Sequence, residues 1–191
     1  MILAGGRSRR MGREKLTIEI GGLTLIEHVN NALSGSCHEV LVVGGGKVGL
    51  EGVKHVADER PGSQGPLAGI EAGLAAAKYD HVFVAAGDMP FLPQGLVEYL
   101  LERLDRGNFV AVIPHHAGRS HPLCGAYARA VLPRVRDALD GGARAVHEFL
   151  EEAGGVEYVG EELLRIGDPD LMLMNVNSPR DLERARREAG R

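Results

Sequence analysis

The sequence predicts an α/β fold in which a mostly parallel sheet is covered by helices on both faces. Short apolar runs typical of strands alternate along the chain with runs that have helical spacing, and such alternation is typical of βαβ units. The 191 residues are 44% hydrophobic and 25% charged, which supplies enough apolar surface for one sizeable core. Because this length is close to that of one domain, we expect a single domain over residues 1–191.

The expected strands are short, and several are continuously apolar, as strands buried on both faces of a parallel sheet are. They cover residues 39–43, 54–57, 81–86, 110–114 and 172–176. A further strand is expected to end near Leu3, and the chain begins almost inside it, which leaves open a start upstream of Met1. In open parallel sheets ligands bind outside the carboxyl ends of the strands, so the loops after these strands are the places to look for a site.

Helices are expected between and after these strands. They cover residues 24–33, 66–77, 93–105, 129–139 and 179–189. The second opens on a proline, which suits the first turn of a helix, and the last follows Asn177-Ser178, a pair that suits an N-cap. Residues 115–127, with Pro122 among them, are where the alternation is expected to break, and they could add an edge or antiparallel strand.

The charge balance excludes several classes of partner. Lys and Arg number 22 and Asp and Glu 26, a net charge of −4, so the chain lacks the positive field that binding to nucleic acid or a membrane surface needs. No apolar run approaches the ~18 residues of a membrane span, and no signal-peptide pattern precedes the first glycines. Cys37 and Cys124 have no metal-ligand spacing and are expected to be reduced core thiols. We therefore expect a cytoplasmic protein that binds neither nucleic acid nor membrane.

Glycine makes up 27 of the 191 residues, about twice the ~7% typical of soluble proteins. The first glycine-rich loop, residues 3–15, holds three glycines and five cations within eleven residues. Glycine lets backbone N–H groups turn toward a ligand, and Arg and Lys around such a concavity suit phosphate oxygens, so a triphosphate is the ligand that fits best. The spacing is not that of a P-loop, because Lys15 is not adjacent to a glycine. The alternative is a solvated basic turn.

Two further glycine-rich loops follow expected strands. Residues 44–49 match the GxGxxG pattern of dinucleotide-binding folds. That motif needs a full helix starting at the glycines, yet only residues 50–53 separate it from the next strand. NAD binding is therefore disfavoured, and we expect a loop whose backbone approaches a base or a ribose. Residues 58–69 could read a purine edge or be ordinary turn chemistry.

An aspartate, Asp88, follows the apolar run 81–86 and is flanked by turn-forming residues. A carboxylate in this position faces the ligand crevice of a parallel sheet. Because Mg²⁺ takes few protein carboxylates and completes its shell with phosphate oxygens and water, Asp88, alone or joined by Asp58, is sufficient for a Mg²⁺ site. A turn or N-cap role for Asp88 is the alternative.

The histidines His115, His116 and His121 lie close together in a segment expected to be a loop. Their spacing does not match a zinc site. We favour a surface or substrate-facing loop, in which His121 fixes local geometry before a proline and Arg119 contacts phosphate.

Two amides, Asn175 and Asn177, stand at an expected junction between a strand and the last helix. Side chains of this kind either cap the helix or contact a substrate there, and both readings stay open.

In combination, five motifs resemble those of the molybdenum cofactor guanylyltransferase family. They are, in order, LAGGRSRRMGREK, GPLAG, GDMP, SHPLCGAY and NVNSPRDL. The first motif alone is typical of the wider group of nucleotidyltransferases, and the others narrow it. The resemblance covers nearly the whole chain and implies a Rossmann-like nucleotidyltransferase fold.

The resemblance also implies an activity and its residues. The activity is transfer of GMP from GTP to molybdopterin bearing molybdenum, with Mg²⁺ and release of pyrophosphate. The matching nucleotide-binding positions are Leu3, Ala4, Gly5, Gly6, Lys15, Asp58 and Asp88. Lys15 would contact phosphate, Arg10 would add to the triphosphate pocket, and Asp88 would hold Mg²⁺; these three are the expected catalytic residues. Arg119, His121, Asn175 and Asn177 are the candidates for contacting the second substrate. Molybdopterin-transfer proteins and apo-molybdoenzymes are the expected protein partners.

The chain departs from the family pattern at two places. Residues 44–46 are glycines where relatives often have an asparagine, and Gly87 stands where they often have a cysteine. Because the first departure removes a side chain expected to contact the base, a cytidylyltransferase or another nucleotidyltransferase of the same fold is the alternative enzyme. A protein that hands over the cofactor without chemistry is an alternative of a different class.

Overall fold

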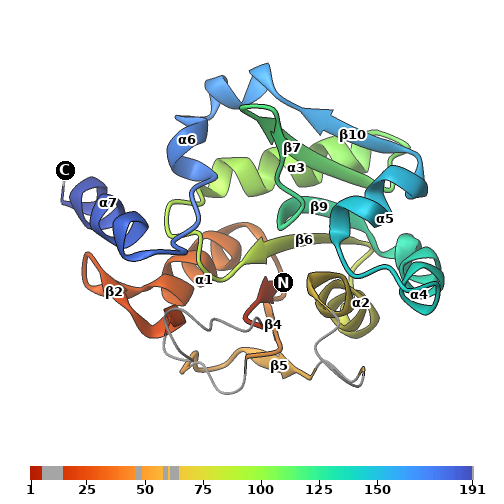
Figure 1. Ribbon diagram of the computed structural model, residues 1–191, viewed down its shortest axis with the longest axis horizontal. Coiled ribbons are helices and arrows are strands. Elements are labelled where there is room, and N and C mark those ends of the chain that lie inside the picture. Colours follow the sequence, from red (N-terminus) through yellow and green to blue (C-terminus); the bar gives the residue numbers. More distant parts are fainter. Residues whose placement is uncertain (6–14, 46–48, 58–59, 61–64, 191) are drawn as a thin grey trace.

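The computed structural model describes residues 1–5, 15–45, 49–57, 60 and 65–190. Within these residues the main sheet has eight strands. Seven follow the order β10-β7-β9-β6-β1-β4-β5 (Figure 1), and β8 pairs with β7 beside this row. The strands are β1 Ile2–Leu3, β4 Leu41–Val43, β5 Lys54–Val56, β6 His81–Ala86, β7 Ala111–His116, β8 Arg119–Ser120, β9 Cys124–Ala128 and β10 Val156–Val159. A separate hairpin consists of β2 Glu19–Ile20 and β3 Leu23–Thr24.

The described structure contains the five helices that the sequence predicts, with boundaries shifted by a few residues, and two further helices, α5 and α6. They are α1 Leu25–Ser36, α2 Pro66–Ala76, α3 Gln94–Arg106, α4 Leu132–Asp140, α5 Val146–Ala153, α6 Pro169–Met172 and α7 Pro179–Ala189. Short 3₁₀ turns cover Lys15–Thr17, Arg129–Val131 and Glu161–Arg165. In the part of the chain that the structure describes, no helix is long and apolar enough to span a membrane.

The first half of the chain builds the parallel part of the sheet. Strand β1 lies between β4 and β6 and runs parallel to both, with Ile2 opposite Val42 and Ala85, and β5 adds to β4 in the same direction. Parallel strands end at one edge of a sheet, so the chain leaves β1, β4, β5 and β6 on the same side. Among the described residues, this edge carries Gly5 after β1 and Asp88 after β6, which are both predicted site residues.

The second half of the chain breaks the alternation within the sheet's interior. Strand β9 lies between β6 and β7 and is antiparallel to both, and β10 pairs parallel to β7. The sequence suggested an edge or antiparallel strand in residues 115–127. The segment holds β8, which is antiparallel to β7 and lies beside the main row, and the start of β9, which is antiparallel and central. Its Tyr127 is fully buried and donates a hydrogen bond from its hydroxyl to the carbonyl of Pro122 at 2.7 Å. All four residues from Cys124 to Tyr127 are buried, as expected of a strand that is covered on both faces.

The strand predicted over residues 172–176 is wrong. Asp168 caps a short helix, α6, by accepting a hydrogen bond from the Asp170 N–H at 3.0 Å, and Pro169 opens it. The residues after α6 form no strand, and the Val176 N–H donates to the carbonyl of Asp88 at 2.9 Å. This apolar run is buried because it packs against other elements, and burial alone gives the pattern that suggested a strand.

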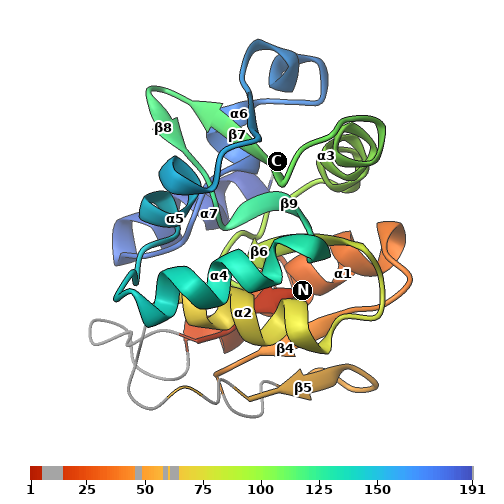
Figure 2. The ribbon, with the colours of Figure 1, turned by 90° about the vertical axis from the view of Figure 1, so that its right-hand side faces the viewer.

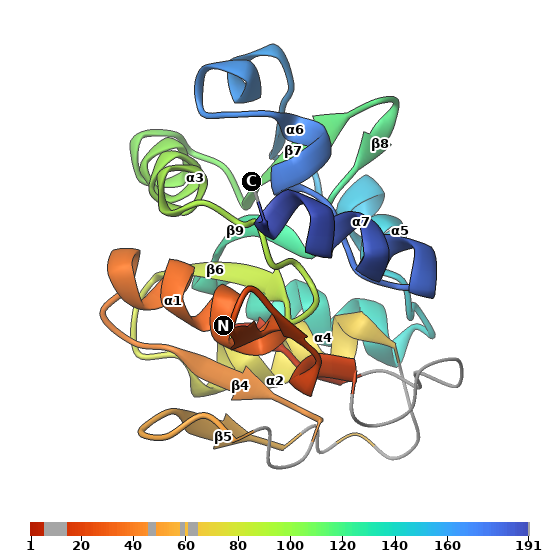
Figure 3. The ribbon, with the colours of Figure 1, turned by 90° about the vertical axis from the view of Figure 1, so that its left-hand side faces the viewer.

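Helices cover both faces of the sheet, which separates two large cores (Figure 2). Helices α1 and α3 pack on one face, and α2, α4 and α5 pack on the other. A third, small core joins the C-terminal helix α7 to the β2–β3 hairpin, at the side of the molecule seen in Figure 3. Its buried members are Ile20, Leu25, Met174, Val176 and Ala185. This core therefore connects the C-terminal segment to residues 20–25.

Candidate active site

Lys15 and Asp88 meet at the edge where the parallel strands end. The Nζ atom of Lys15 lies 2.5 Å from Oδ2 of Asp88, and the side chains are only 11% and 14% exposed. Asp88 follows the last residue of β6 by two positions, and Lys15 begins the 3₁₀ turn that precedes the hairpin. Both are predicted site residues, and the fold brings them into direct contact.

Two asparagines from the C-terminal segment complete this polar group. Asn175 donates from Nδ2 to Oδ1 of Asp88 at 2.7 Å, and Lys15 donates to Oδ1 of Asn177 at 2.8 Å. Together with the Val176 N–H on the Asp88 carbonyl, three successive residues contact the pair. Both asparagines therefore lie at the site, although they arrive there from an irregular segment and not from the end of a strand.

The arrangement leaves capacity for a ligand. An ammonium has three donors, and the contacts with Asp88 and Asn177 use two of those of Lys15. Each oxygen of the Asp88 carboxylate accepts one hydrogen bond from a described residue and has a second lone pair. The site can thus offer a cation to phosphate and a carboxylate to a metal at the same place.

The donor chemistry fits Mg²⁺ better than a softer metal. Asp88 and the amides of Asn175 and Asn177 supply oxygen atoms, and Mg²⁺ needs few protein carboxylates when phosphate and water complete its shell. Among the described residues no group of three or more His, Cys, Asp or Glu side chains could hold a metal ion. A metal cation at this site would therefore be held by Asp88 and by oxygen atoms of the bound nucleotide or water.

Close packing at the strand ends explains several of the glycines. A Cβ at Gly87 would lie 3.2 Å from the side chain of Leu16 and 3.4 Å from that of Ile2, so a larger residue fits there only if these side chains shift slightly. At Gly45, with φ of 71°, a Cβ would lie 2.4 Å from the carbonyl oxygen of Ala4. Residues 44 and 45 are thus glycines because the loops after β1 and β4 touch, a reason other than the ligand approach that the sequence suggested.

The remaining positions of the first loop are placed by the backbone. Ala4 donates its N–H to the carbonyl of Val43 at 2.9 Å, and the Leu3 carbonyl accepts from the Gly87 N–H at 3.1 Å. The Leu3 side chain is buried in the core, so only its backbone faces the edge. The predicted residues Gly6, Arg10 and Asp58 lie outside the described residues.

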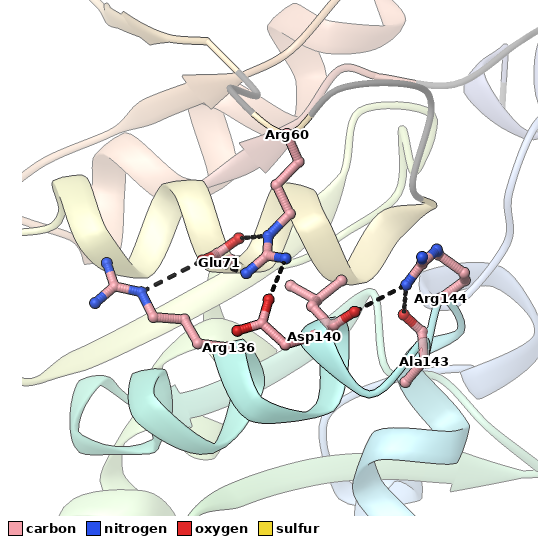
Figure 4. Close-up of polar contacts among 7 residues, drawn as sticks. Arg60, Glu71, Arg136, Asp140, Ala143 and Arg144 are labelled. Atoms are coloured by element: carbon pink, nitrogen blue, oxygen red, sulfur yellow. Dashed lines mark hydrogen bonds and ion pairs between the residues drawn. The ribbon is translucent and has the colours of Figure 1, made fainter.

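Arg60, the one described residue between positions 57 and 65, makes ion pairs to two helices (Figure 4). The Arg60 guanidinium donates to both carboxylate oxygens of Glu71 on α2, at 2.5 and 3.1 Å, and to Asp140 on α4 at 2.7 Å. Hydrogen bonds from Arg60, with smaller help from Arg136, lower the pKa of Glu71 although burial opposes the shift. This cluster joins the two helices on one face of the sheet and does not contact Lys15 or Asp88.

A cavity of about 240 Å³ borders the site on the side of β9. Its lining residues are Met89, Ser120, His121, Pro122, Leu123, Cys124 and Asn175. Because Asn175 also contacts Asp88, the cavity opens beside the polar group. Burial raises the pKa of Cys124 to about 12, so its thiol stays protonated and adds an apolar wall.

His121 lies in this cavity, while the other two histidines do not line it. Burial, and then the charges of His116, His115 and Arg119, lower the pKa of His121, which leaves its imidazole neutral near pH 7. The prediction of a loop is wrong for His115 and His116, because both belong to strand β7, where they pair with β8. Arg119 lies in β8 and is exposed, and His116 contacts Asp170 at 3.0 Å.

A second cavity, of about 390 Å³, lies at the opposite end of the parallel strands. It is lined by residues near the starts of β4 and β6, among them Leu41, His81 and Phe83. It is larger than the first cavity but is separated by the length of the strands from Lys15 and Asp88. Chemistry, and not volume, therefore identifies the site.

Sequence reasoning missed one polar residue of this region, Asp181. Its Oδ2 accepts hydrogen bonds from the Ser178 N–H, the Ser178 hydroxyl and the Asn177 N–H. Burial of the carboxyl opposes ionisation, but these hydrogen bonds and the charge of Lys15 outweigh it and lower the pKa of Asp181. The spacing of Ser178 and Asp181 is that of a capping box, a signal that was visible in the sequence.

Comparisons with known proteins agree with the motifs. The family model of the MobA-like NTP transferase domain matches residues 1–154. The chain is 36% identical over 189 residues to a probable molybdenum cofactor guanylyltransferase from Pelotomaculum thermopropionicum, covering 97% of this chain and 90% of the relative. It is 32% identical to the molybdenum cofactor guanylyltransferase of Desulfosudis oleivorans, covering 97% and 92%.

Solved structures are similar over the whole chain. Molybdopterin-guanine dinucleotide biosynthesis protein A from Archaeoglobus fulgidus superposes with a TM-score of 0.83 at 31% identity, covering 99% of this chain and 97% of that one. A 2-C-methyl-D-erythritol 4-phosphate cytidylyltransferase from Thermus thermophilus has a TM-score of 0.73 at 24% identity, covering 100% and 98%, and shows the fold alone. These matches confirm the predicted mostly parallel α/β fold and the resemblance read from the five motifs. The chain belongs to the MobA-like NTP transferase domain family, and it is a nucleotidyltransferase.

Proposed function

We propose that the protein transfers GMP from GTP to molybdopterin that carries molybdenum, forming the guanine dinucleotide cofactor and releasing pyrophosphate in the presence of Mg²⁺. The observation that carries this proposal is the contact of Lys15 with Asp88 at the carboxyl edge of β1 and β6. It joins a phosphate-binding type of cation to a metal-binding type of carboxylate, in a chain whose relatives are named for this reaction.

The proposed reaction needs no covalent intermediate with the protein. An oxygen of the acceptor's phosphate attacks the α-phosphorus of GTP, a new P–O bond forms, and the bond to the β-phosphate breaks as pyrophosphate leaves. A phosphate monoester is already a nucleophile, so catalysis rests on alignment and on neutralising the developing charge. Lys15 would supply a positive charge to the phosphates. Asp88 would hold Mg²⁺, which when bound would supply positive charge to neutralise the phosphates.

The two substrates would approach from the two sides of this pair. The backbone of Leu3, Ala4 and Gly5 lies at the strand edge, and the triphosphate would bind there with Gly6, Arg10 and Asp58 as further contacts. The acceptor would bind from the cavity beside Asn175, where neutral His121 can hydrogen-bond without repelling or attracting a charge. Arg119 would contact the acceptor's phosphate from the rim. Asn175 and Asn177 hydrogen-bond to Asp88 and Lys15, and a contact with the acceptor would be a second role for them.

The same proposal bears on the extent of the domain, the location of the protein and its partners. We propose that residues 155–191, beyond the match to the family model, belong to the same domain as the rest, since Asn175 and Asn177 contact Asp88 and Lys15. The cytoplasmic location and the expected partners, molybdopterin-transfer proteins and apo-molybdoenzymes, stay predictions.

The test measures pyrophosphate release from GTP, CTP, ATP and UTP, each with Mg²⁺ and authentic molybdenum-molybdopterin. We expect release with GTP and formation of the guanine dinucleotide product. Release with CTP in preference to GTP would assign the chain to the alternative cytidylyltransferases. Binding of GTP, seen as a rise in Tm, without any product would indicate a handover protein.

A further inference from the structure

Asp181, in the first turn of α7, is a carboxylate to which the proposed reaction gives no role. Its Oδ2 accepts from the Ser178 N–H at 2.8 Å, from the Ser178 hydroxyl at 2.8 Å and from the Asn177 N–H at 3.0 Å. In return the Asp181 N–H donates to the Ser178 hydroxyl at 3.3 Å. The first contacts are those of a helix cap. The contact with Asn177 goes one residue beyond the cap, toward the active site.

Asn177 connects this carboxylate to Lys15. The backbone N–H of Asn177 is held by Asp181, while its side-chain Oδ1 accepts a hydrogen bond from Lys15 at 2.8 Å. One residue thus has its backbone anchored on α7 and its side chain on the cation of the site. Moving that backbone would move the acceptor that, together with Asp88, orients the ammonium.

The small core keeps this connection in place. Val176 is fully buried against Ile20 and Leu25, which follow Lys15 closely in the chain, and Ala185 of α7 joins the same core. Asp181 is therefore fixed relative to the Lys15 segment from two directions, by the packing of α7 and by the hydrogen bond to Asn177. A carboxylate with three hydrogen bonds in such a setting has little freedom to shift.

A second helix of the molecule provides the comparison that separates capping from positioning. On α5, Oε2 of Glu148 accepts from the N–H groups of Ala145 and Arg144, each at 3.4 Å. This is the same three-residue spacing of a carboxylate after the start of a helix. Neither of its partners contacts Lys15 or Asp88, so Glu148 caps a helix only.

We propose that Asp181 is a positioning residue, which acts through Asn177 to hold the Lys15 ammonium in the orientation that the nucleotide's phosphates require. The effect on turnover rests on the proposed function, whereas the effect on Lys15 itself does not. Removing the Asp181 carboxylate should release Asn177, free Lys15 from one of its two partners, and leave the remainder of the site in place.

The first measurement is the rate at which Lys15 is acylated by an N-hydroxysuccinimide ester, followed by mass spectrometry without any nucleotide. In D181A and in N177A we expect this rate to rise about fivefold, the factor that one hydrogen bond typically contributes. In E148A, the matched cap variant, the rate should stay that of wild type. In D181N, which keeps an acceptor for the Asn177 N–H, the rise should be smaller than in D181A.

The second measurement is a double-mutant cycle on kcat for GTP. Because Asp181 acts through Asn177, the D181A/N177A protein should turn over no more slowly than N177A, whereas D181A alone loses about tenfold. D181A should lose about 2–4 °C of Tm, as for a lost cap in a protein of this size. E148A, whose cap contacts are longer, should lose no more Tm than D181A and keep its kcat.

The outcomes separate the two proposals. An unchanged Lys15 rate in D181A beside a raised rate in N177A would overturn the positioning role, and so would an equal rise in E148A. Additive losses of kcat in the double variant would overturn the route through Asn177. A raised Lys15 rate in D181A together with no GMP transfer by wild type would overturn the proposed function and leave the role of Asp181 standing.

Discussion

The site consists of two parts that are held in different ways. In the strand-end part, residues 3–5 and 87–88, backbone hydrogen bonds fix the position of the chain. The Leu3 carbonyl accepts from the Gly87 N–H, and the Ala4 N–H donates to the Val43 carbonyl. In the C-terminal part, residues 175–177, position depends on side chains, with Asn175 on Asp88, Asn177 on Lys15 and Val176 in a small core. The first part sits in the continuous sheet, and the second is attached to it by few contacts.

This difference has a consequence for substitutions. A side chain at the end of a strand can be replaced without moving the backbone that carries it, because the ladder of the sheet holds that backbone. A side chain in the C-terminal part is itself the means of attachment, so its loss moves its neighbours. Chemistry and placement are therefore separable in the strand-end part and coupled in the C-terminal part.

The largest effect should come from Asp88→Asn, which keeps the shape of the side chain and removes its charge. We expect pyrophosphate release to fall about 10²–10³-fold, the range for removing one group that stabilises charge in a transition state. The far-UV circular dichroism and the binding of GTP in the absence of Mg²⁺ should stay those of wild type. Turnover close to wild type would exclude Asp88 from the metal and phosphate chemistry.

The next effect belongs to Lys15. Lys15→Met keeps the apolar stem in its buried position and removes the ammonium, and we expect kcat to fall about 10²-fold. Lys15→Arg should not rescue it, because a planar guanidinium does not reproduce a point charge shared between Asp88 and Asn177. Steady-state kinetics with GTP measures both variants, and full rescue by arginine would show that only a charge is needed.

Sequence reasoning succeeded where the sheet decides position. The strand at residues 81–86 and the helix at 179–189 match β6 and α7, and the position of Asp88 after β6 follows from the rule for parallel sheets. It failed where tertiary packing decides: the apolar run 172–176 is buried in two cores without pairing as a strand. Asp181 was missed because a capping box predicts a helix start, and its link to Lys15 exists only in the folded chain.

A pair of valines provides a direct test of the comparison. Val84 in β6 and Val176 are both fully buried, and replacing either by alanine should lower Tm by about 2–6 °C through the lost packing. Only Val176→Ala should also lower kcat, by several-fold, because Val176 holds the two asparagines on the site. Thermal denaturation and GTP turnover of the two variants measure this. Equal losses of kcat would show that the C-terminal part is no more sensitive than the sheet.

The smallest effect concerns pH and the cavity beside the site. Since burial first, and neighbouring positive charges second, lower the pKa of His121 in the folded protein, the unfolded chain binds the proton more readily. Stability should therefore fall as the pH drops from the ordinary histidine pKa of about 6.5 to the lower pKa of the folded state, and stay level with respect to this group above that window.

His121→Gln removes the group, so the difference in Tm between pH 8 and pH 5 should be smaller in the variant than in wild type. An unchanged pH dependence would show that the cavity leaves this imidazole as free to ionise as an exposed one.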